Sequence, residues 1–140
     1  MIIRKLELND FENGLLETLS SLQEVNLTPE SAKLVYNGYI ADSNSHIYVV
    51  EDKGKVIACG TLLIEYKLIH SFCISIHLED IAVHKDFQNM GYGKLLIDYL
   101  IKESKLINAY KITLDCSKEL KSFYEKLDFL QSDVHMRLNI

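Results

Sequence analysis

The sequence predicts an α/β protein, in which a central mixed β-sheet is flanked by helices. In the first half, β-rich runs at Ile47–Val50 and Val56–Tyr66 flank a turn at Asp52–Lys55 whose glycine can take positive φ, which predicts an antiparallel hairpin. In the second half strands alternate with helices, so the sheet is expected to be mixed. No linker rich in proline, glycine or serine divides the 140 residues. One domain spanning residues 1–140 is therefore expected.

The elements before the hairpin are a short strand and two helices. Met1–Arg4 is β-prone, and apolar residues recur every three or four positions over Asp10–Leu22, which predicts an amphipathic helix. Thr28 followed by Pro29 is typical of a helix start, because the hydroxyl caps free N–H groups and the ring tolerates the first helical position. This second helix is expected to run to about Tyr39.

The elements after the hairpin complete the order βααβββαβαβ. Apolar and polar residues segregate at helical spacing after the glycines at 91 and 93, which predicts a helix with one buried face. The expected elements are a strand at His77–Val83, the helix at Lys94–Lys105, a strand at Lys111–Asp115, a short helix at Glu119–Leu127 and a last strand at Val134–Leu138.

Composition narrows the range of functions and cellular locations. Fifteen Lys and Arg against twenty Asp and Glu give a net charge of −5, which disfavours a nucleic-acid partner. No apolar run approaches the ~20 residues that cross a bilayer, and charges within the first ten residues leave no room for a secretory signal. Three cysteines at unrelated spacings suit free thiols in a reducing compartment. We expect a cytoplasmic protein without membrane contact.

The most informative stretch is the glycine-bearing loop Gln88–Lys94, between a strand and a helix. Backbone N–H groups at a helix N-terminus bind phosphate oxygens, and the helix dipole reinforces this. The loop is not a Walker loop, because Leu95 follows Lys94 where that motif has Ser or Thr, and it is not GxGxxG. A tight strand-to-helix connection without a ligand is the alternative interpretation.

The surrounding residues resemble the GCN5-related N-acetyltransferase (GNAT) superfamily. Its acetyl-CoA loop follows the pattern Gln/Arg-x-x-Gly-x-Gly/Ala, which Gln88–Gly93 matches at every fixed position. Glu79–Val83 before the loop and Phe123–Lys126 beyond it extend the match. Ile64–His70 and Tyr110–Cys116 resemble, more narrowly, the members that acetylate glucosamine 6-phosphate. The resemblance implies the GNAT fold, acetyl-CoA as acetyl donor, CoA as product, and a route to UDP-N-acetylglucosamine.

The resemblance also implies roles at the reacting centre. Tyr124 would protonate the leaving thiolate, and Glu79 would accept the ammonium proton. Glu79 and Asp80 are neighbours on a strand, so their side chains are expected to point to opposite faces. Asp115 matches a position at the acetyl-CoA end of the site, and the catalytic set is Glu79, Tyr124 and Asp115.

The binding residues carried over from the family fall into two groups. Those expected at the cofactor are Ile81, Ala82, Val83, Gln88, Asn89, Met90, Gly91, Tyr92, Gly93, Lys94, Asp115 and Tyr124. Those expected at the sugar phosphate are Gln23, Lys67, His70, Glu79, Asp80, Tyr110, Lys111 and Arg137. Tyr110 and Lys111 match a segment that the partner subunit supplies in the family, so the resemblance implies a homodimer with shared active sites.

Four positions depart from the family pattern. Asn139 stands where the family has a substrate-binding arginine, and Arg137, two residues earlier, is the nearest cation. Gln23 replaces a threonine, Leu120 an asparagine before the Phe-Tyr pair, and Asn89 a loop glycine. These changes bear on phosphate binding and cofactor affinity more than on the class of reaction.

Two other functions compete with this one: a GNAT enzyme that acetylates another amine, such as a protein N-terminus or lysine, and a non-catalytic acyl-CoA-binding module. Cys116 has no paired base in the sequence, so direct transfer in a ternary complex is expected. No His or Cys pair has zinc-ligand spacing, and a metal site is not expected.

Overall fold

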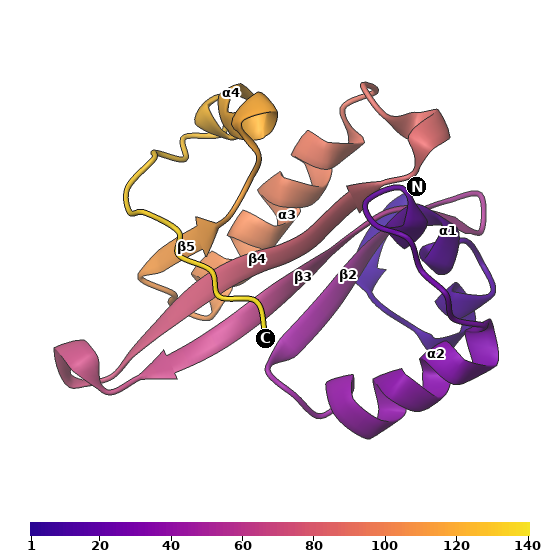
Figure 1. Cartoon of the computed structure of the whole chain (residues 1–140), viewed down its shortest axis with the longest axis horizontal. Coiled ribbons are helices and arrows are strands. Elements are labelled where there is room, and N and C mark those ends of the chain that lie inside the picture. Colours follow the sequence, from indigo (N-terminus) through magenta and orange to yellow (C-terminus); the bar gives the residue numbers. More distant parts are fainter.

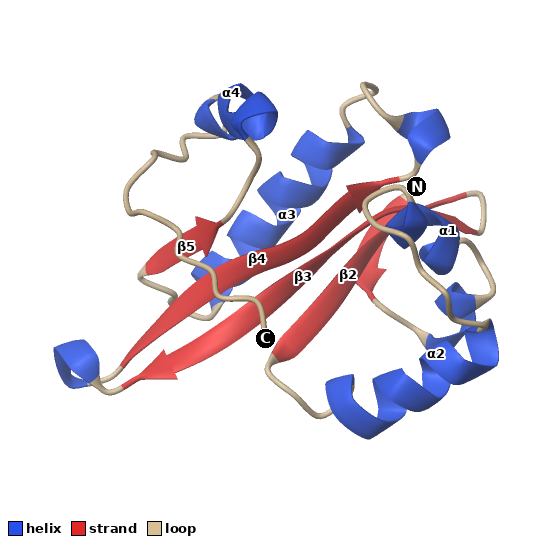
Figure 2. Cartoon of the chain, in the orientation of Figure 1, coloured by secondary structure: helices blue, strands red, loops and turns tan.

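The computed structural model describes all 140 residues and contains one five-stranded mixed sheet with helices on both faces (Figures 1 and 2). The strands lie in the order β1-β2-β3-β4-β5; the first four are antiparallel to their neighbours, and β5 is parallel to β4. The predicted mixed α/β fold is confirmed. The strands are β1 Ile2–Lys5, β2 Ser45–Asp52, β3 Lys55–Lys67, β4 Cys73–Val83 and β5 Lys111–Leu114, and the α-helices are α1 Leu15–Ser20, α2 Pro29–Val35, α3 Tyr92–Leu106 and α4 Lys121–Glu125.

Two hydrophobic cores lie on opposite faces of this sheet. Neighbouring strand residues alternate between them, because successive side chains of a strand point to opposite faces. Ala58 packs in the core under α3, whereas Cys59 packs with Leu15 of α1 and Ala32 of α2. The sheet thus has an α3 face and an α1/α2 face. None of the helices is long and apolar enough to span a membrane.

Local signals at the hairpin and at α2 are confirmed. Lys53 and Gly54 both have positive φ, 50° and 80°, as a type I′ turn between twisted antiparallel strands requires. Thr28 caps α2: its hydroxyl accepts from the Ser31 N–H, and the Ser31 hydroxyl accepts in return from the Thr28 N–H. A helix start of this kind contributes about 1 kcal/mol.

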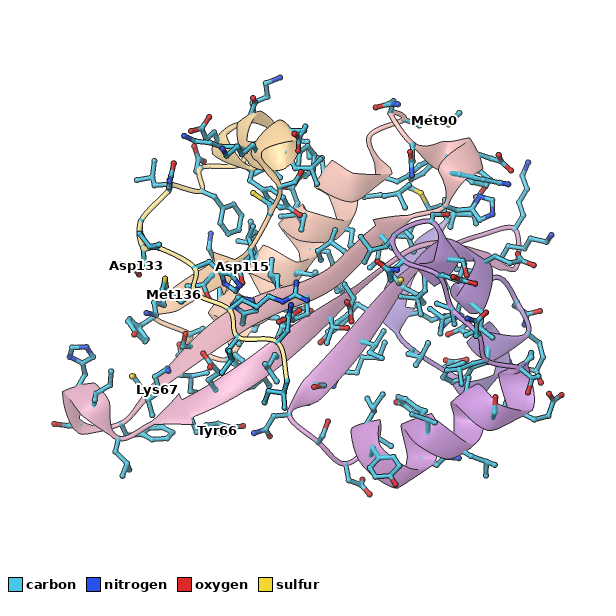
Figure 3. All side chains as sticks on the ribbon, viewed as in Figure 1. Tyr66, Lys67, Met90, Asp115, Asp133 and Met136 are labelled. Carbon is cyan, nitrogen blue, oxygen red and sulfur yellow. The ribbon has the colours of Figure 1, made fainter.

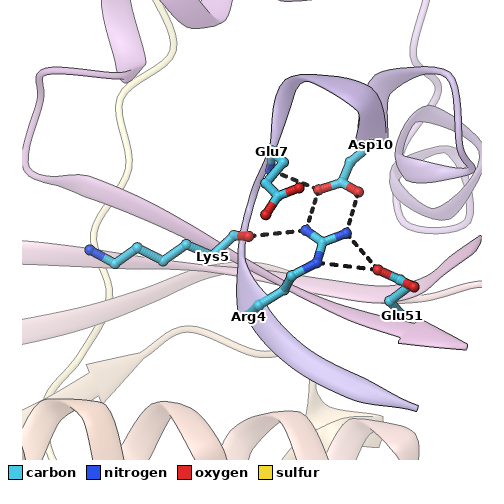
Figure 4. Close-up of polar contacts among 5 residues, drawn as sticks. All are labelled: Arg4, Lys5, Glu7, Asp10 and Glu51. Atoms are coloured by element: carbon cyan, nitrogen blue, oxygen red, sulfur yellow. Dashed lines mark hydrogen bonds and ion pairs between the residues drawn. The ribbon is translucent and has the colours of Figure 1, made fainter. Parts of the chain in front are cut away.

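A buried ion pair fastens the N-terminal strand to the segment that follows it (Figure 4). Arg4 of β1 donates two hydrogen bonds of 2.8 Å to the carboxylate of Asp10, which is only 2% exposed. Arg4 also donates to Glu51 of β2 at 2.7 Å, and Asp10 accepts from the Glu7 N–H at 2.8 Å. Every oxygen of Asp10 therefore has a donor.

The first predicted helix is only partly correct. A 3₁₀ turn, Leu8–Phe11, occupies its start, and α1 begins only at Leu15. Gly14 separates the two with φ of 99°, and a β-carbon there would lie 2.9 Å from the carbonyl oxygen of Val56. This close approach to β3 breaks the helix at Gly14. Thr18 of α1 also donates to the Val56 carbonyl oxygen, at 2.9 Å.

The predicted last strand at Val134–Leu138 is wrong for the single chain. Residues 130–140, here called the C-terminal tail, form no strand and cross the α1/α2 face of the sheet in front of β5 and β4 (Figure 1). Val134, Met136 and Leu138 are 83%, 84% and 86% exposed. A strand needs a hydrogen-bonded neighbour, and within one chain the tail meets none.

Candidate active site

The loop between β4 and α3 is shaped by two left-handed residues and one side-chain hydrogen bond. Gly91 caps α3 with φ of 89°, and Asn89 takes φ of 62°, a left-handed conformation that asparagine tolerates. Gln88 donates from Nε2 to the carbonyl oxygen of Val83 at 3.1 Å, which ties the loop to the end of β4. The loop is thus positioned beside the strand from which it departs.

The N-terminus of α3 presents free backbone donors at this loop. The first hydrogen bond of the helix runs from the Leu95 N–H to the carbonyl oxygen of Gly91, at 3.0 Å. The N–H groups of Tyr92, Gly93 and Lys94 precede it and have no partner within the helix. Because α3 is 15 residues long, its dipole adds to their attraction for an anion.

The edge of β4 next to this helix is open on one side. β5 pairs with β4 only from Ser75 to Leu78, whereas β4 continues to Val83. Beyond Leu78 the β4 backbone groups that point toward β5 have no strand partner, and the chain leaves the end of β5 toward α4, away from β4 (Figure 1). An extended amide chain, such as a pantetheine arm, fits such an edge by pairing as a strand would.

A β-bulge corrects the prediction that Glu79 and Asp80 point to opposite faces. Cys59 pairs with Ala82 and Thr61 with Glu79, so Gly60 alone faces two residues of β4. Asp80 takes up the extra residue with φ of 51°. Glu79 lies opposite Thr61, and Asp80 and Thr61 line one groove. Both carboxylates therefore emerge on the α1/α2 face.

That groove lies between the sheet and the segment joining α1 to α2, and encloses about 320 Å³. Its walls are mostly apolar, while Gln23, Glu24, Thr61 and Asp80 supply the polar side chains. Gln23 is among the residues predicted to bind substrate. The structure thus brings Gln23 and Asp80 to the same groove although they are 57 positions apart in the sequence.

Asp115, at the end of β5, contacts His77 of β4 on the same face; the sequence analysis gave this histidine no role at the site. His77 Nε2 lies 3.3 Å from Glu79 Oε1 and 3.5 Å from Asp115 Oδ2. His135 of the C-terminal tail contacts Asp115 from the other side at 3.1 Å. The sequence did carry a signal for this contact: His77 and Glu79 are two residues apart on one strand, and such residues share a face. No group of three or more such side chains is arranged to hold a metal ion.

Tyr124 of α4 is 8% exposed and packs edge-to-face against Phe123 and Phe129. Burial raises the pKa of its phenol, and the neighbouring Cys116 thiol contributes in the same direction. Cys116 follows Asp115 directly, so Tyr124 lies near the end of β5, across the open edge from β4. A raised pKa keeps the hydroxyl protonated and able to donate.

Comparison with known proteins identifies the family. Residues 10–129 match the model of the acetyltransferase (GNAT) family. The chain belongs to this family. The GNAT resemblance that the loop and its flanking strands indicated is confirmed.

Several GNAT relatives are similar over nearly their whole length. The glucosamine 6-phosphate N-acetyltransferase of Candida albicans is 39% identical over 95% of this chain and 91% of its own, and that of Arabidopsis thaliana 32% identical over 96% and 93%. The crystal structure of the Arabidopsis enzyme superimposes with a TM-score of 0.90 at 31% identity, covering 99% of this chain and 97% of that one.

A second group of predicted GNAT substrate residues lies at the other end of the sheet. Lys67 ends β3, and the rings of His70 and Tyr110 are 5.8 Å apart. Lys111 lies over the Tyr110 ring at 5.3 Å. Figure 3 shows Lys67 and the loop residue Met90 at opposite ends of the β3–β4 pair. Within one chain the structure does not bring this group to Glu79.

The separation follows from the strand register. Thr61, opposite Glu79, and Lys67, opposite Cys73, are six positions apart on β3. At about 3.3 Å per residue their Cα atoms lie roughly 20 Å apart along the strand. Arg137 is exposed in the C-terminal tail and donates to Asn139 Oδ1 at 2.6 Å. Asn139, which stands where the family has a substrate-binding arginine, thus accepts a hydrogen bond from Arg137, the nearest cation in the sequence.

Proposed function

We propose that the chain transfers acetyl from acetyl-CoA to the 2-amino group of glucosamine 6-phosphate, in one ternary complex. The observation that carries this proposal is the loop Gln88–Lys94, opening α3 beside an unpaired strand edge, in a chain whose relatives are named for this reaction. The product, N-acetylglucosamine 6-phosphate, is a precursor of UDP-N-acetylglucosamine. Three free cysteines favour a reducing compartment, which suits a cytoplasmic location.

The residues at the loop fit acetyl-CoA, which supplies the acetyl group as a thioester. The unpaired N–H groups at Tyr92–Lys94 suit the pyrophosphate of CoA. Asn89, Met90 and Gly91 form the turn that lets the pyrophosphate come close to these N–H groups. The open edge Ile81–Val83 suits the pantetheine amides, which need backbone partners and no particular side chain. Gln88 acts indirectly, by holding the carbonyl of Val83 and thereby the angle between strand and loop.

The acidic residues on the α1/α2 face suit an acceptor that arrives as an ammonium ion. Glu79, Asp80 and Asp115 attract the cation, and Gln23 adds a hydrogen-bonding group from the opposite wall of the groove. The amine must lose a proton before it attacks, and Glu79 is positioned to accept it, directly or through one water. Asp80, carried to the same face by the bulge, orients the sugar.

Tyr124 suits the opposite task, which is to give a proton to the departing thiolate. Its raised pKa keeps the phenol neutral at physiological pH, and it lies on the α4 side of the open edge. A phenol in a nearly dry site donates a strong hydrogen bond to a developing negative charge. Base and acid thus come from opposite sides of the gap between β4 and β5.

We infer that the active enzyme is a homodimer whose sites are shared. A cationic and aromatic group lies at the other end of the sheet from Glu79 of its own chain, which suits it to the phosphate of a substrate bound by the partner; it consists of Lys67, His70, Tyr110 and Lys111. The C-terminal tail supports this: apolar side chains at 134, 136, 138 and 140 alternate with polar ones, a strand pattern that lacks a neighbour. Pairing with a second copy would supply it and bring Arg137 to the interface.

Thiol release from acetyl-CoA tests the reaction, with glucosamine 6-phosphate, glucosamine and a lysine peptide as parallel acceptors. Fast release with the sugar phosphate, and slow release with the other two, is the expected result. Release with another amine alone would make the chain a GNAT enzyme of different acceptor. Binding of acetyl-CoA without release to any acceptor would make it a non-catalytic module.

A further inference from the structure

His77 occupies the point where the acidic residues of the site converge. It projects from the middle of β4 on the α1/α2 face, two residues before Glu79. Its side chain is 21% exposed, and its Nε2 atom faces Glu79 at 3.3 Å and Asp115 at 3.5 Å. β3 brings apolar Leu63 opposite it, while Glu65 of β3 and Lys111 of β5 both lie opposite Ser75, two residues before His77. From the C-terminal tail, His135 contacts Asp115.

Thr113 sets the orientation of this imidazole. The Thr113 hydroxyl lies 2.9 Å from His77 Nδ1 and 3.3 Å from the carbonyl oxygen of Ile76. Carboxylates only accept hydrogen bonds, so Nε2, which faces two of them, carries a proton, and Nδ1 can accept from the Thr113 hydroxyl. The ring is therefore fixed in one plane with Nε2 turned toward the two carboxylates.

The two carboxylates need a partner between them. Two carboxylates that approach the same point repel each other, and this repulsion favours conformations in which they turn apart. The Nε2–H of His77, lying between Glu79 and Asp115, offsets the repulsion and orients both. No Lys or Arg side chain pairs with either carboxylate, and His135 contacts only the far side of Asp115.

We propose that His77 is a positioning residue for acetyl transfer, which holds Glu79 and Asp115 together so that Glu79 meets the acceptor ammonium. The proposal rests on the proposed function, because it concerns the carboxylate that takes the amine's proton. The proton passes from the ammonium nitrogen to a Glu79 oxygen, leaving a neutral amine with its lone pair free to attack. His77 touches neither the acceptor nor the thioester.

The test compares His77→Ala, His77→Gln and His46→Gln in the thiol-release assay with glucosamine 6-phosphate, at pH values below and above the pKa of its amine. His46 is a half-buried strand histidine outside the site, and is the matched control. For His77→Ala we expect kcat to fall about 10- to 100-fold at the lower pH, with an unchanged KM for acetyl-CoA. Glutamine keeps an N–H near the Nε2 position and should recover most of the loss.

The pH dependence separates positioning from a structural role. Above its pKa the amine arrives without the proton, so the defect of His77→Ala should shrink as pH rises. A defect that stays constant with pH, or wild-type kcat for His77→Ala at the lower pH, would overturn the proposal. If His77→Ala does not fold, Thr113→Val, which frees Nδ1, must show the same shrinking defect or the proposal fails. Wild-type protein inactive toward the sugar phosphate would instead refute the proposed function.

Discussion

Gly60 and Ile81 face each other across the β-bulge between β3 and β4 with no room for a side chain at Gly60. A β-carbon at Gly60 would lie 2.6 Å from Cδ1 of Ile81 and 3.3 Å from side-chain atoms of Leu96 and Leu100. The bulge needs this space, because it turns Ile81 toward α3, while Asp80 lines the groove and Glu79 points to the same α1/α2 face. The packing of Gly60 against Ile81 on the α3 face thus fixes the positions of Glu79 and Asp80 on the α1/α2 face.

Substitution Gly60→Ala should lower the free energy of unfolding by about 1–3 kcal/mol, because the added methyl overpacks a full core. It should also lower kcat by displacing Glu79. The matched control is Gly38→Ala: Gly38 has nothing within 4 Å of its β-carbon position and lacks positive φ. Urea denaturation measures both variants, and equal stabilities would show that the bulge tolerates a side chain.

Substitution Tyr124→Phe should lower kcat by about 10²-fold or more with little change in either KM, because only the proton donor is removed. The ring remains and its contacts with Phe123 and Phe129 persist, so stability should hold. Tyr39→Phe, on a residue that is 81% exposed, is the control. Steady-state kinetics checks this, and wild-type turnover would remove Tyr124 from the mechanism.

Substitution Asp10→Asn should cost about 2–4 kcal/mol of unfolding free energy, since it leaves the Arg4 guanidinium partly buried beside a neutral amide. The hydrogen bonds to Asp10 are the main reason that the pKa of Arg4 is raised, so Arg4 stays charged. Glu12→Gln removes an exposed ion pair with Lys33 and should cost less than about 1 kcal/mol. Similar melting temperatures for the two variants would contradict the anchoring role of Asp10.

Substitution Lys67→Ala should raise KM for glucosamine 6-phosphate and leave unphosphorylated glucosamine almost unaffected, because only the phosphate loses a cation. Lys102→Ala, on the exposed face of α3, should change neither KM. The comparison of kcat/KM for the two sugars is the measurement. Equal losses for both would assign Lys67 a structural role.

Shared active sites predict complementation between Glu79→Ala and Lys67→Ala when glucosamine 6-phosphate is assayed well below the KM of the Lys67→Ala variant. Glu79→Ala and Lys67→Ala chains, unfolded together and refolded as a mixture, should form some heterodimers with one site that carries both changes and one intact site. Random pairing makes half of the dimers mixed, so about a quarter of wild-type activity should return. Activity no higher than the average of the separate variants would place Glu79 and Lys67 in the same chain's site.

Much of the framework could be predicted because it depends on neighbours in sequence. The Thr28 cap, the Lys53-Gly54 turn and the left-handed Gly91 before α3 each reflect conformational preferences of one or two residues. The loop pattern Gln88–Gly93 likewise lies within one short stretch. These signals placed the loop correctly between the end of β4 and the start of α3.

The errors arose where distant segments impose a conformation. Gly14 breaks the first helix because β3 approaches it, and the regular alternation of β4 fails at Asp80 because Gly60 faces two residues. The last strand fails because a strand needs a neighbour that one chain does not provide.

By itself, the sequence determined the mixed α/β fold, the GNAT loop and the identities of the acidic and aromatic residues that suit acetyl transfer. Only the tertiary structure decided that Glu79 and Asp80 share a face, that His77 joins Glu79 to Asp115, and that Lys67 lies far from all of them. The physical reason is that propensities act over a few residues, whereas register, bulges and sheet order arise from contacts between segments far apart in the chain.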